Sequence, residues 1–242
     1  MLDSIKRWLG PARPPRRDWQ AQADWAQAKG WPLRGVRDAD GFVIDGRCGT
    51  HAWRLEWGPS QRSYIAGDEL RLRAELELPR ELQVLLLDRR SMEAIEHTVF
   101  EQYVEGVQTR IDTGTPAEMR WLVMYPKLGG GELKALRERY GALASFKPWL
   151  LQWLEGPLTG ALDALVRPDE QPLVLMVARR RLSLRTALAE PEVDALQRWL
   201  ALFECALREA QRVSVDFADA GAPSTQPSLF PQAALRGGRS SH

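Results

Sequence analysis

Apolar and polar residues alternate along the first third of the chain, which is the pattern of a half-buried β-strand. Over residues 69–78 every even position is Leu or Ala and every odd position is Glu or Arg. Residues 53–57 repeat this alternation, residues 42–45 form a shorter apolar strand, and residues 82–87 form an apolar run typical of a more central strand. Because the four segments follow one another with short connections, they predict an antiparallel sheet rather than βαβ units.

Helical spacing replaces this alternation further along the chain. Apolar residues recur every three or four positions over residues 90–105, 132–140, 147–166 and 191–215. Pro157 lies inside the third of these segments, so we expect a kink there or a division into two helices.

Two shorter segments complete the pattern. Residues 173–177 and 182–185 predict a hairpin that turns around three consecutive arginines. Residues 115–118 read Thr-Pro-Ala-Glu, a capping box with Pro at the first helical position, and predict a helix that ends near Tyr125.

The fold class that follows is α+β, an antiparallel sheet packed against helices. We expect the sheet to contain residues from about 41–88 and 172–186. We divide the chain into a basic helical arm over residues 1–37, a single α+β domain over residues 38–216, and a disordered tail over residues 217–242. The tail is rich in Gly, Pro, Ser and Gln and has no apolar periodicity.

The arm contains two predicted helices. Residues 1–9 place three apolar side chains on one face, at spacings of three and four (Leu2, Ile5 and Leu9). The second helix covers residues 19–29, with Asp18 as N-cap and Gly30 after its last turn. Its tryptophans need a partner surface, so we expect the arm to pack on the body.

The chain is nearly neutral overall, but its charges are unevenly distributed between segments. The chain has 242 residues, with 33 Lys and Arg against 32 Asp and Glu, so the net charge is +1. Residues 1–37 hold eight basic and three acidic residues, whereas residues 68–105 hold ten acidic residues and five arginines. Near neutrality excludes a general coat of positive charge, so we expect contact with nucleic acid to be indirect only.

Cysteine and hydropathy counts bear on the compartment. Two cysteines do not make a disulfide framework, and no segment approaches 18 uninterrupted apolar residues. We therefore expect a cytoplasmic protein. Three histidines give little material for a metal site, and we expect no metal and no cofactor.

Two short motifs offer nucleophilic or acid chemistry. Residues 112–114 read Asp-Thr-Gly, the tripeptide of aspartic proteases, but one copy would require a homodimer, and a turn before a cap at Thr115 explains it as well. Cys48 and His51 are close enough in sequence for a thiolate–imidazole pair, yet no orienting residue is evident. We favour a tight glycine turn with a half-buried cysteine.

Two further patterns point to metal or phosphate. Glu93, His97, Glu101 and Glu105 recur every four residues and form one side of a potential metal site. No matching row is visible elsewhere, so a solvated acidic face is the simpler interpretation. Residues 129–131 are three glycines, but they lack the Gly-Lys-Ser/Thr ending of a phosphate loop.

A basic surface is predicted at the tip of the hairpin. Arg179, Arg180 and Arg181 are consecutive, and Arg185 follows on the same predicted strand. Arginine pairs phosphates in a bidentate manner. The competing interpretation is a solvated turn, or arginines partnered by the acidic segment over residues 68–105, and we favour it.

One segment of the tail carries a recognisable motif. Gln226-Pro227-Ser228-Leu229-Phe230 resembles the pentapeptide by which replication and repair proteins bind the bacterial sliding clamp, commonly written Gln-Leu-Ser/Asp-Leu-Phe. Gln226, Ser228, Leu229 and Phe230 match the motif, and Pro227 departs from the usual Leu. The resemblance implies that Gln226 hydrogen-bonds in a small pocket while Leu229 and Phe230 fill an apolar one.

These observations favour a non-enzymatic cytosolic adaptor whose tail docks a protein partner, the sliding clamp being the partner that the resemblance implies. The alternative is a peripheral protein at the inner membrane face, bound weakly through residues 1–17. A hydrolase built on Asp112 or Cys48 is the third interpretation. The oligomeric state stays open.

Overall fold

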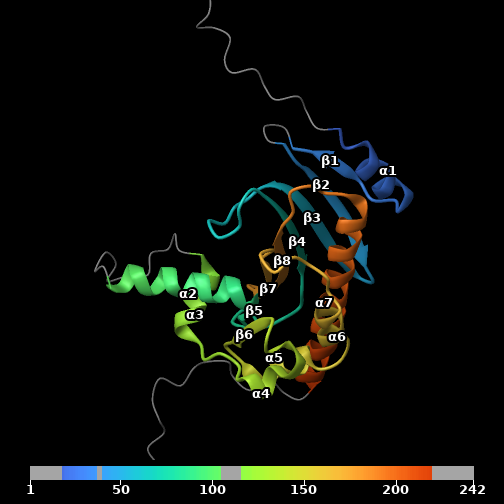
Figure 1. Ribbon diagram of the computed structural model, residues 1–242. Helices are drawn as coiled ribbons and strands as arrows, with labels where there is room; N and C mark the ends of the chain where they lie inside the picture. The colour runs from blue at the N-terminus through green and yellow to red at the C-terminus, as the bar shows by residue number, and fades with distance from the viewer. Residues whose placement is uncertain (1–17, 37–39, 105–115, 220–242) are drawn as a thin grey trace, which may run out of the picture.

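A computed structural model describes residues 18–36, 40–104 and 116–219. Within them, eight strands form one antiparallel sheet in the order β1-β2-β3-β4-β8-β7-β5-β6 (Figure 1). The strands are β1 Leu33–Gly35, β2 Phe42–Cys48, β3 His51–Pro59, β4 Asp68–Glu75, β5 Val84–Asp88, β6 Tyr140–Ala144, β7 Leu173–Ala178 and β8 Arg181–Ala187.

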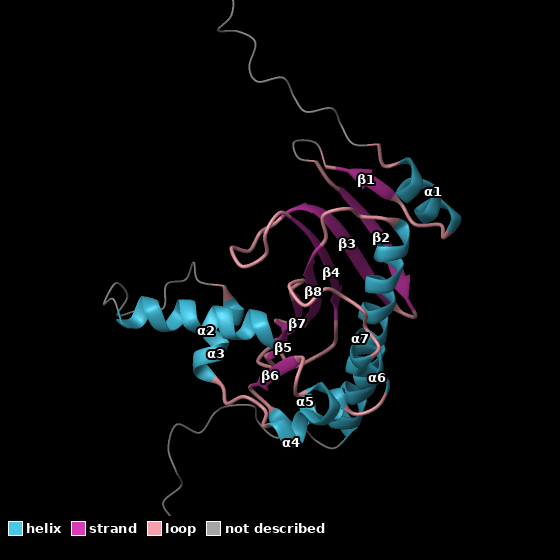
Figure 2. Cartoon of the chain, in the orientation of Figure 1, coloured by secondary structure: helices cyan, strands magenta, loops and turns pink. Residues whose placement is uncertain are grey.

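Helices pack on both faces of the sheet, so the α+β class is confirmed (Figure 2). The helices are α1 Gln20–Ala28, α2 Arg89–Val104, α3 Ala117–Met124, α4 Gly130–Leu133, the 3-10 turn η1 Lys134–Leu136, α5 Lys147–Leu154, α6 Pro157–Asp163 and α7 Val193–Asp219. The larger core joins one face of the sheet to α1, α5, α6 and α7. A smaller core joins the other face, at β5, β6 and β7, to α2 and α3.

The alternation in β4 places one set of side chains in the larger core. Leu70, Leu72 and Ala74 are buried there, while the Arg and Glu side chains between them lie on the opposite face. On that opposite face, α2 and α3 pack over β5, β6 and β7.

The hairpin β7–β8 is confirmed. Its position in the sheet could not be predicted from the local sequence pattern. It pairs β8 with β4 and β7 with β5, and so separates β4 from β5, which follow each other in sequence. Arg179 and Arg180 turn the hairpin with φ angles of +51° and +64°. Positive φ at both central residues matches the right-handed twist of the flanking strands.

Several element predictions need correction. The helix expected over residues 132–140 is confined to α4 and η1, and the chain then enters β6, whose five residues are all buried. Strand β1 lies in the segment assigned to a helical arm, and it pairs with β2. Helix α7 runs to Asp219, so the tail boundary expected at residue 217 falls inside a helix.

Pro157 divides the segment over residues 147–166 into α5 and α6, as predicted, because a proline ring is accepted at a helix start and not inside one. The predicted packing of the second arm helix on the body is also confirmed, since Trp25 belongs to the larger core. Trp19 packs edge-on against Trp57, and Trp31 against Trp53, so α1 and the segment after it are held on the sheet by aromatic contacts.

Candidate functional site

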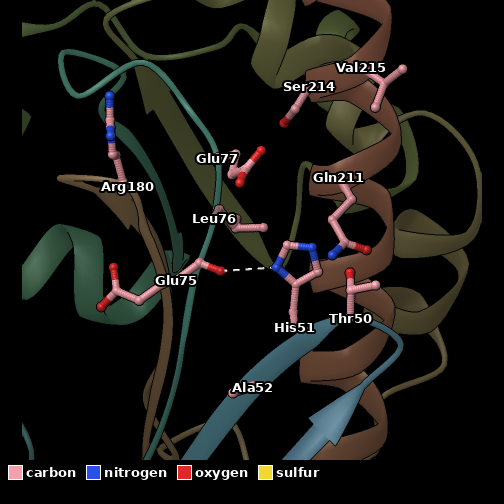
Figure 3. Close-up of a pocket in the computed structure, with 10 residues that line it drawn as sticks. All are labelled: Thr50, His51, Ala52, Glu75, Leu76, Glu77, Arg180, Gln211, Ser214 and Val215. Atoms are coloured by element: carbon pink, nitrogen blue, oxygen red, sulfur yellow. Dashed lines mark hydrogen bonds between the residues drawn. The ribbon is translucent and has the colours of Figure 1, made fainter.

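An open hollow of about 810 Å³ lies where the end of the sheet meets the last turns of α7. The β2–β3 turn, the chain after β4, the β7–β8 turn and α7 all contribute to its wall (Figure 3). Leu76 N–H donates to the Arg180 carbonyl at 2.7 Å, which joins two of these elements.

His51 stands in the middle of this wall. Its Nδ1 lies 3.2 Å from the Glu75 carbonyl oxygen. Because a carbonyl oxygen only accepts, Nδ1 carries the proton in this arrangement. The other edge of the ring faces Gln211 of α7 (Figure 3). The hollow thus presents hydrogen-bonding groups from Gln211 and Ser214 beside an exposed apolar side chain, Val215.

No hydrogen bond joins the Cys48 thiol to the His51 imidazole in the described part of the chain, so the thiolate–imidazole hypothesis gains no support from their contacts. Cys48 and His51 face each other in the strand register of β2 and β3, across a turn in which Gly49 has a φ of +59°. However, Cys48 Sγ lies 3.8 Å from an Arg208 guanidinium nitrogen, and His51 is held by a backbone carbonyl. The favoured interpretation, a glycine turn with a half-buried cysteine, is confirmed.

Part of the predicted basic surface is neutralised by carboxylates. Arg181 pairs with Glu75 at 2.6 Å, and Arg185 pairs with the fully buried Glu69 at 2.6 Å. Both carboxylates belong to the acidic segment over residues 68–105, as the competing interpretation predicted. Arg179 and Arg180 are exposed at the turn.

A buried ionic cluster, which the motif search did not identify, holds the β3–β4 loop against α3. Glu118 is fully buried on the first turn of α3. Its Oε1 accepts from Arg62 Nε and from the Tyr64 hydroxyl, each at 2.5 Å. Burial, together with the nearby Glu118 carboxylate, raises the pKa of Tyr64 far above its ordinary value.

The capping box predicted at residues 115–118 is wrong. Pro116 is the N-cap of α3 and makes no side-chain cap bond, and Glu118 turns inward to Arg62 and Tyr64. Helical spacing does indicate that Glu118 is buried, because it precedes Trp121 and Leu122 by three and four residues and so shares their buried face.

The row of acidic residues on α2 forms an exposed face. His97 Nδ1 and Glu101 Oε2 are 3.4 Å apart, and both side chains are more than half exposed. In the described ranges, no group of three His, Cys, Asp or Glu is placed to hold a metal ion. Glu105 lies outside those ranges, as do residues 112–114.

Other predicted sites also fall outside the described residues. These are residues 1–17 and the tail residues Gln226, Ser228, Leu229 and Phe230. The three glycines over residues 129–131 open the short helix α4, where Gly129 N–H donates to Glu132 Oε2 at 2.9 Å. None of the described helices is long and apolar enough to span a bilayer.

Comparison with known proteins does not assign this chain to a family. No family model matches the chain, and no curated protein matches it. One solved structure, the mycobacterial trehalose monomycolate transport factor A, aligns with a TM-score of 0.47 and 9% sequence identity. The alignment covers 81% of this chain and 97% of that one.

Proposed function

We propose that this chain is a cytoplasmic interaction protein that docks a protein partner through Gln226–Phe230, and that the partner is a bacterial sliding clamp. The motif itself carries the proposal. Leu229 and Phe230 are an adjacent apolar pair in a segment whose composition cannot form a core, and four of the five residues match the clamp-binding pentapeptide.

The described end of α7 limits how far the motif can lie from the body. Near its C-terminal end, helix α7 buries Val213 in the larger core and packs Phe217 against it, so this end is held on the body. Seven peptide units join Asp219 to Gln226, and at about 3.3–3.6 Å each they span at most about 25 Å. A partner bound at the motif is therefore held near the hollow beside the last turns of α7.

The direct test is equilibrium binding of the full chain to a purified bacterial sliding clamp. Replacing two apolar anchors, Leu229→Ala with Phe230→Ala, is expected to weaken binding at least about thirtyfold, the scale of losing interface hot spots. The matched control is Leu235→Ala, another tail leucine outside the motif, which should leave the affinity unchanged. Equal affinity of the double variant and the parent chain would overturn the proposal.

A gain of affinity provides a second test. Pro227 occupies the position where the pentapeptide usually has Leu, so Pro227→Leu is expected to tighten clamp binding by restoring an apolar contact. If Pro227→Leu weakens binding, the match to the pentapeptide is coincidental and the clamp assignment fails.

A further inference from the structure

Strands β1–β4 and β8 turn an arginine-rich face away from the larger core. Because side chains alternate along a strand, the residues between the buried apolar positions share this face. On these strands its charged residues are seven arginines and four carboxylates, an excess of three positive charges in a chain whose net charge is +1. The residues that define this arginine face are Arg34, Arg47, Arg54, Arg71, Arg73, Arg181, Arg185, Asp45, Glu56, Glu69 and Glu75.

Most carboxylates of the arginine face lie deeper than the arginines that they hold. Asp45 pairs with Arg54 at 2.7 Å, and the aspartate side chain is 29% exposed whereas the arginine is 40% exposed. Glu56 pairs with Arg73 at 2.8 Å, with exposures of 19% and 40%. Glu75 is the exception among the four, since its side chain is 67% exposed. The ion pairs therefore orient the arginines from below and leave their guanidinium groups on the outside.

Two arginines meet at the centre of the exposed part of this face. Arg54 of β3 is directly opposite Arg73 of β4, and the uncharged Ser183 of β8 is directly opposite Arg73 on its other side. Residues in this relation have Cβ atoms about 4.5–5.5 Å apart, and like charges placed so are unfavourable. Proteins retain such local conflicts mainly at functional sites. The ligand that relieves this one is an anion, and arginine pairs phosphate in a bidentate manner.

The remaining composition of the arginine face narrows the ligand. On these strands it carries no aromatic residue on which the bases of a single strand could stack. Its largest apolar residue is Val43, so it offers little to insert into a bilayer. From β1 to β8 it spans four strand spacings, about 19 Å, whereas duplex DNA carries one negative charge per about 1.7 Å of its axis. The face is therefore wide enough to meet several phosphates.

We propose that the arginine face binds the phosphate backbone of duplex DNA without reading its sequence, with Arg54 and Arg73 at the centre of the contact. The expectation of indirect contact with nucleic acid rests on the net charge of the whole chain, and the fold gathers these arginines from strands that are distant in sequence. The contact uses no residue of the tail, so it is independent of the clamp-binding proposal.

Fluorescence anisotropy of a labelled DNA duplex titrated with the full chain tests this contact. Arg54→Gln with Arg73→Gln should weaken binding at least about tenfold at about 50 mM salt, and should reduce the slope of log affinity against log salt by about two. The matched control is Arg137→Gln with Arg212→Gln, which removes two exposed, ion-paired arginines outside the face and should change neither quantity.

Two further variants separate the charge of the face from its folding. Arg54→Lys with Arg73→Lys keeps the charge and should keep the affinity within about threefold of the parent chain. Ser183→Asp adds a carboxylate beside Arg73 without removing an arginine, and should weaken binding at least about fivefold, whereas Ser183→Asn should not.

The same titrations contain the results that would overturn the proposal. Unchanged affinity in the double Gln variant or in Ser183→Asp would do so, as would an affinity of the parent chain that does not fall with salt. A clear preference between two duplexes of unrelated sequence would contradict recognition through phosphates alone. Tighter binding to vesicles that contain phosphatidylserine than to the duplex would assign the face to a membrane instead.

Discussion

Removal of the Glu118 carboxylate is the perturbation with the largest predicted effect on stability. Glu118→Ala leaves the Arg62 guanidinium and the Tyr64 hydroxyl without the acceptor that each contacts at 2.5 Å. The Arg62 side chain is only 20% exposed and that of Glu118 is fully buried, so little water replaces the lost bonds. The loop between β3 and β4 also loses its attachment to α3.

The magnitude follows from this burial. Breaking a buried ion pair from one side costs about 3–5 kcal/mol, because the remaining charge is left uncompensated. Arg62 keeps partial access to water, which lowers the expected loss of unfolding free energy to about 2–4 kcal/mol. With a urea dependence of about 2 kcal/mol per molar, the unfolding midpoint should fall by about 1–2 M.

Urea unfolding followed by tryptophan fluorescence and circular dichroism measures this loss. Glu118→Gln, which keeps one acceptor, should lose less than Glu118→Ala. Glu138→Ala is the matched control, because Glu138 pairs with Arg137 at a highly exposed site and should change the unfolding free energy by less than about 0.5 kcal/mol. If Glu118→Ala costs less than about 1 kcal/mol, the carboxylate does not hold the loop and the reasoning is refuted.

Three further predictions concern single residues. The pKa of Tyr64 is raised in the folded chain. The contribution of its protonated hydroxyl to folding stability is therefore complete below the pKa of about 10 in the unfolded chain, and it is lost as pH rises above that value. Urea unfolding at pH 9 to 11 should show stability falling with pH, and the fall should be shallower in Tyr64→Phe; equal slopes would contradict the assignment. Gly46→Ala would place a Cβ 2.2 Å from the Trp53 ring, so it should cost about 1–3 kcal/mol in the same assay, whereas Gly131→Ala, with open space around it, should be nearly neutral. Burial raises the pKa of the Cys205 thiol, so iodoacetamide at pH 8 should alkylate Cys205 several times more slowly in the folded chain than in urea, as read by peptide mass spectrometry; similar rates would show that this thiol is not shielded.

Most of the elements that sequence analysis identified have one apolar and one polar face; β5, predicted from an apolar run and buried throughout, is an exception. β4 alternates from Glu69 to Glu75, and α7 repeats apolar residues at three and four positions over 27 residues, so each signals its own buried side. β6 carries no such signal, because all five of its residues are buried and a short apolar run does not distinguish strand from helix. β1 has three residues, too few to show a period.

The candidate sites also differ in whether the sequence alone can identify them. The tail motif is contiguous, so its residues can be named from sequence alone. Glu118 and Arg62 are 56 residues apart, and only the packing of α3 against the β3–β4 loop brings them together. The smaller core likewise depends on how α2 and α3, separated by residues 105–115, pack on the same face of the sheet.

Local pattern therefore determined the fold class, the hairpin at Arg179–Arg181 and the break at Pro157, because each depends on backbone preferences and on a face repeated every two or every 3.6 residues. Tertiary structure alone decided the insertion of the hairpin between β4 and β5 and the burial of Glu118 with Tyr64. These depend on which surfaces meet after the chain folds, and the side chains that meet there are distant in sequence.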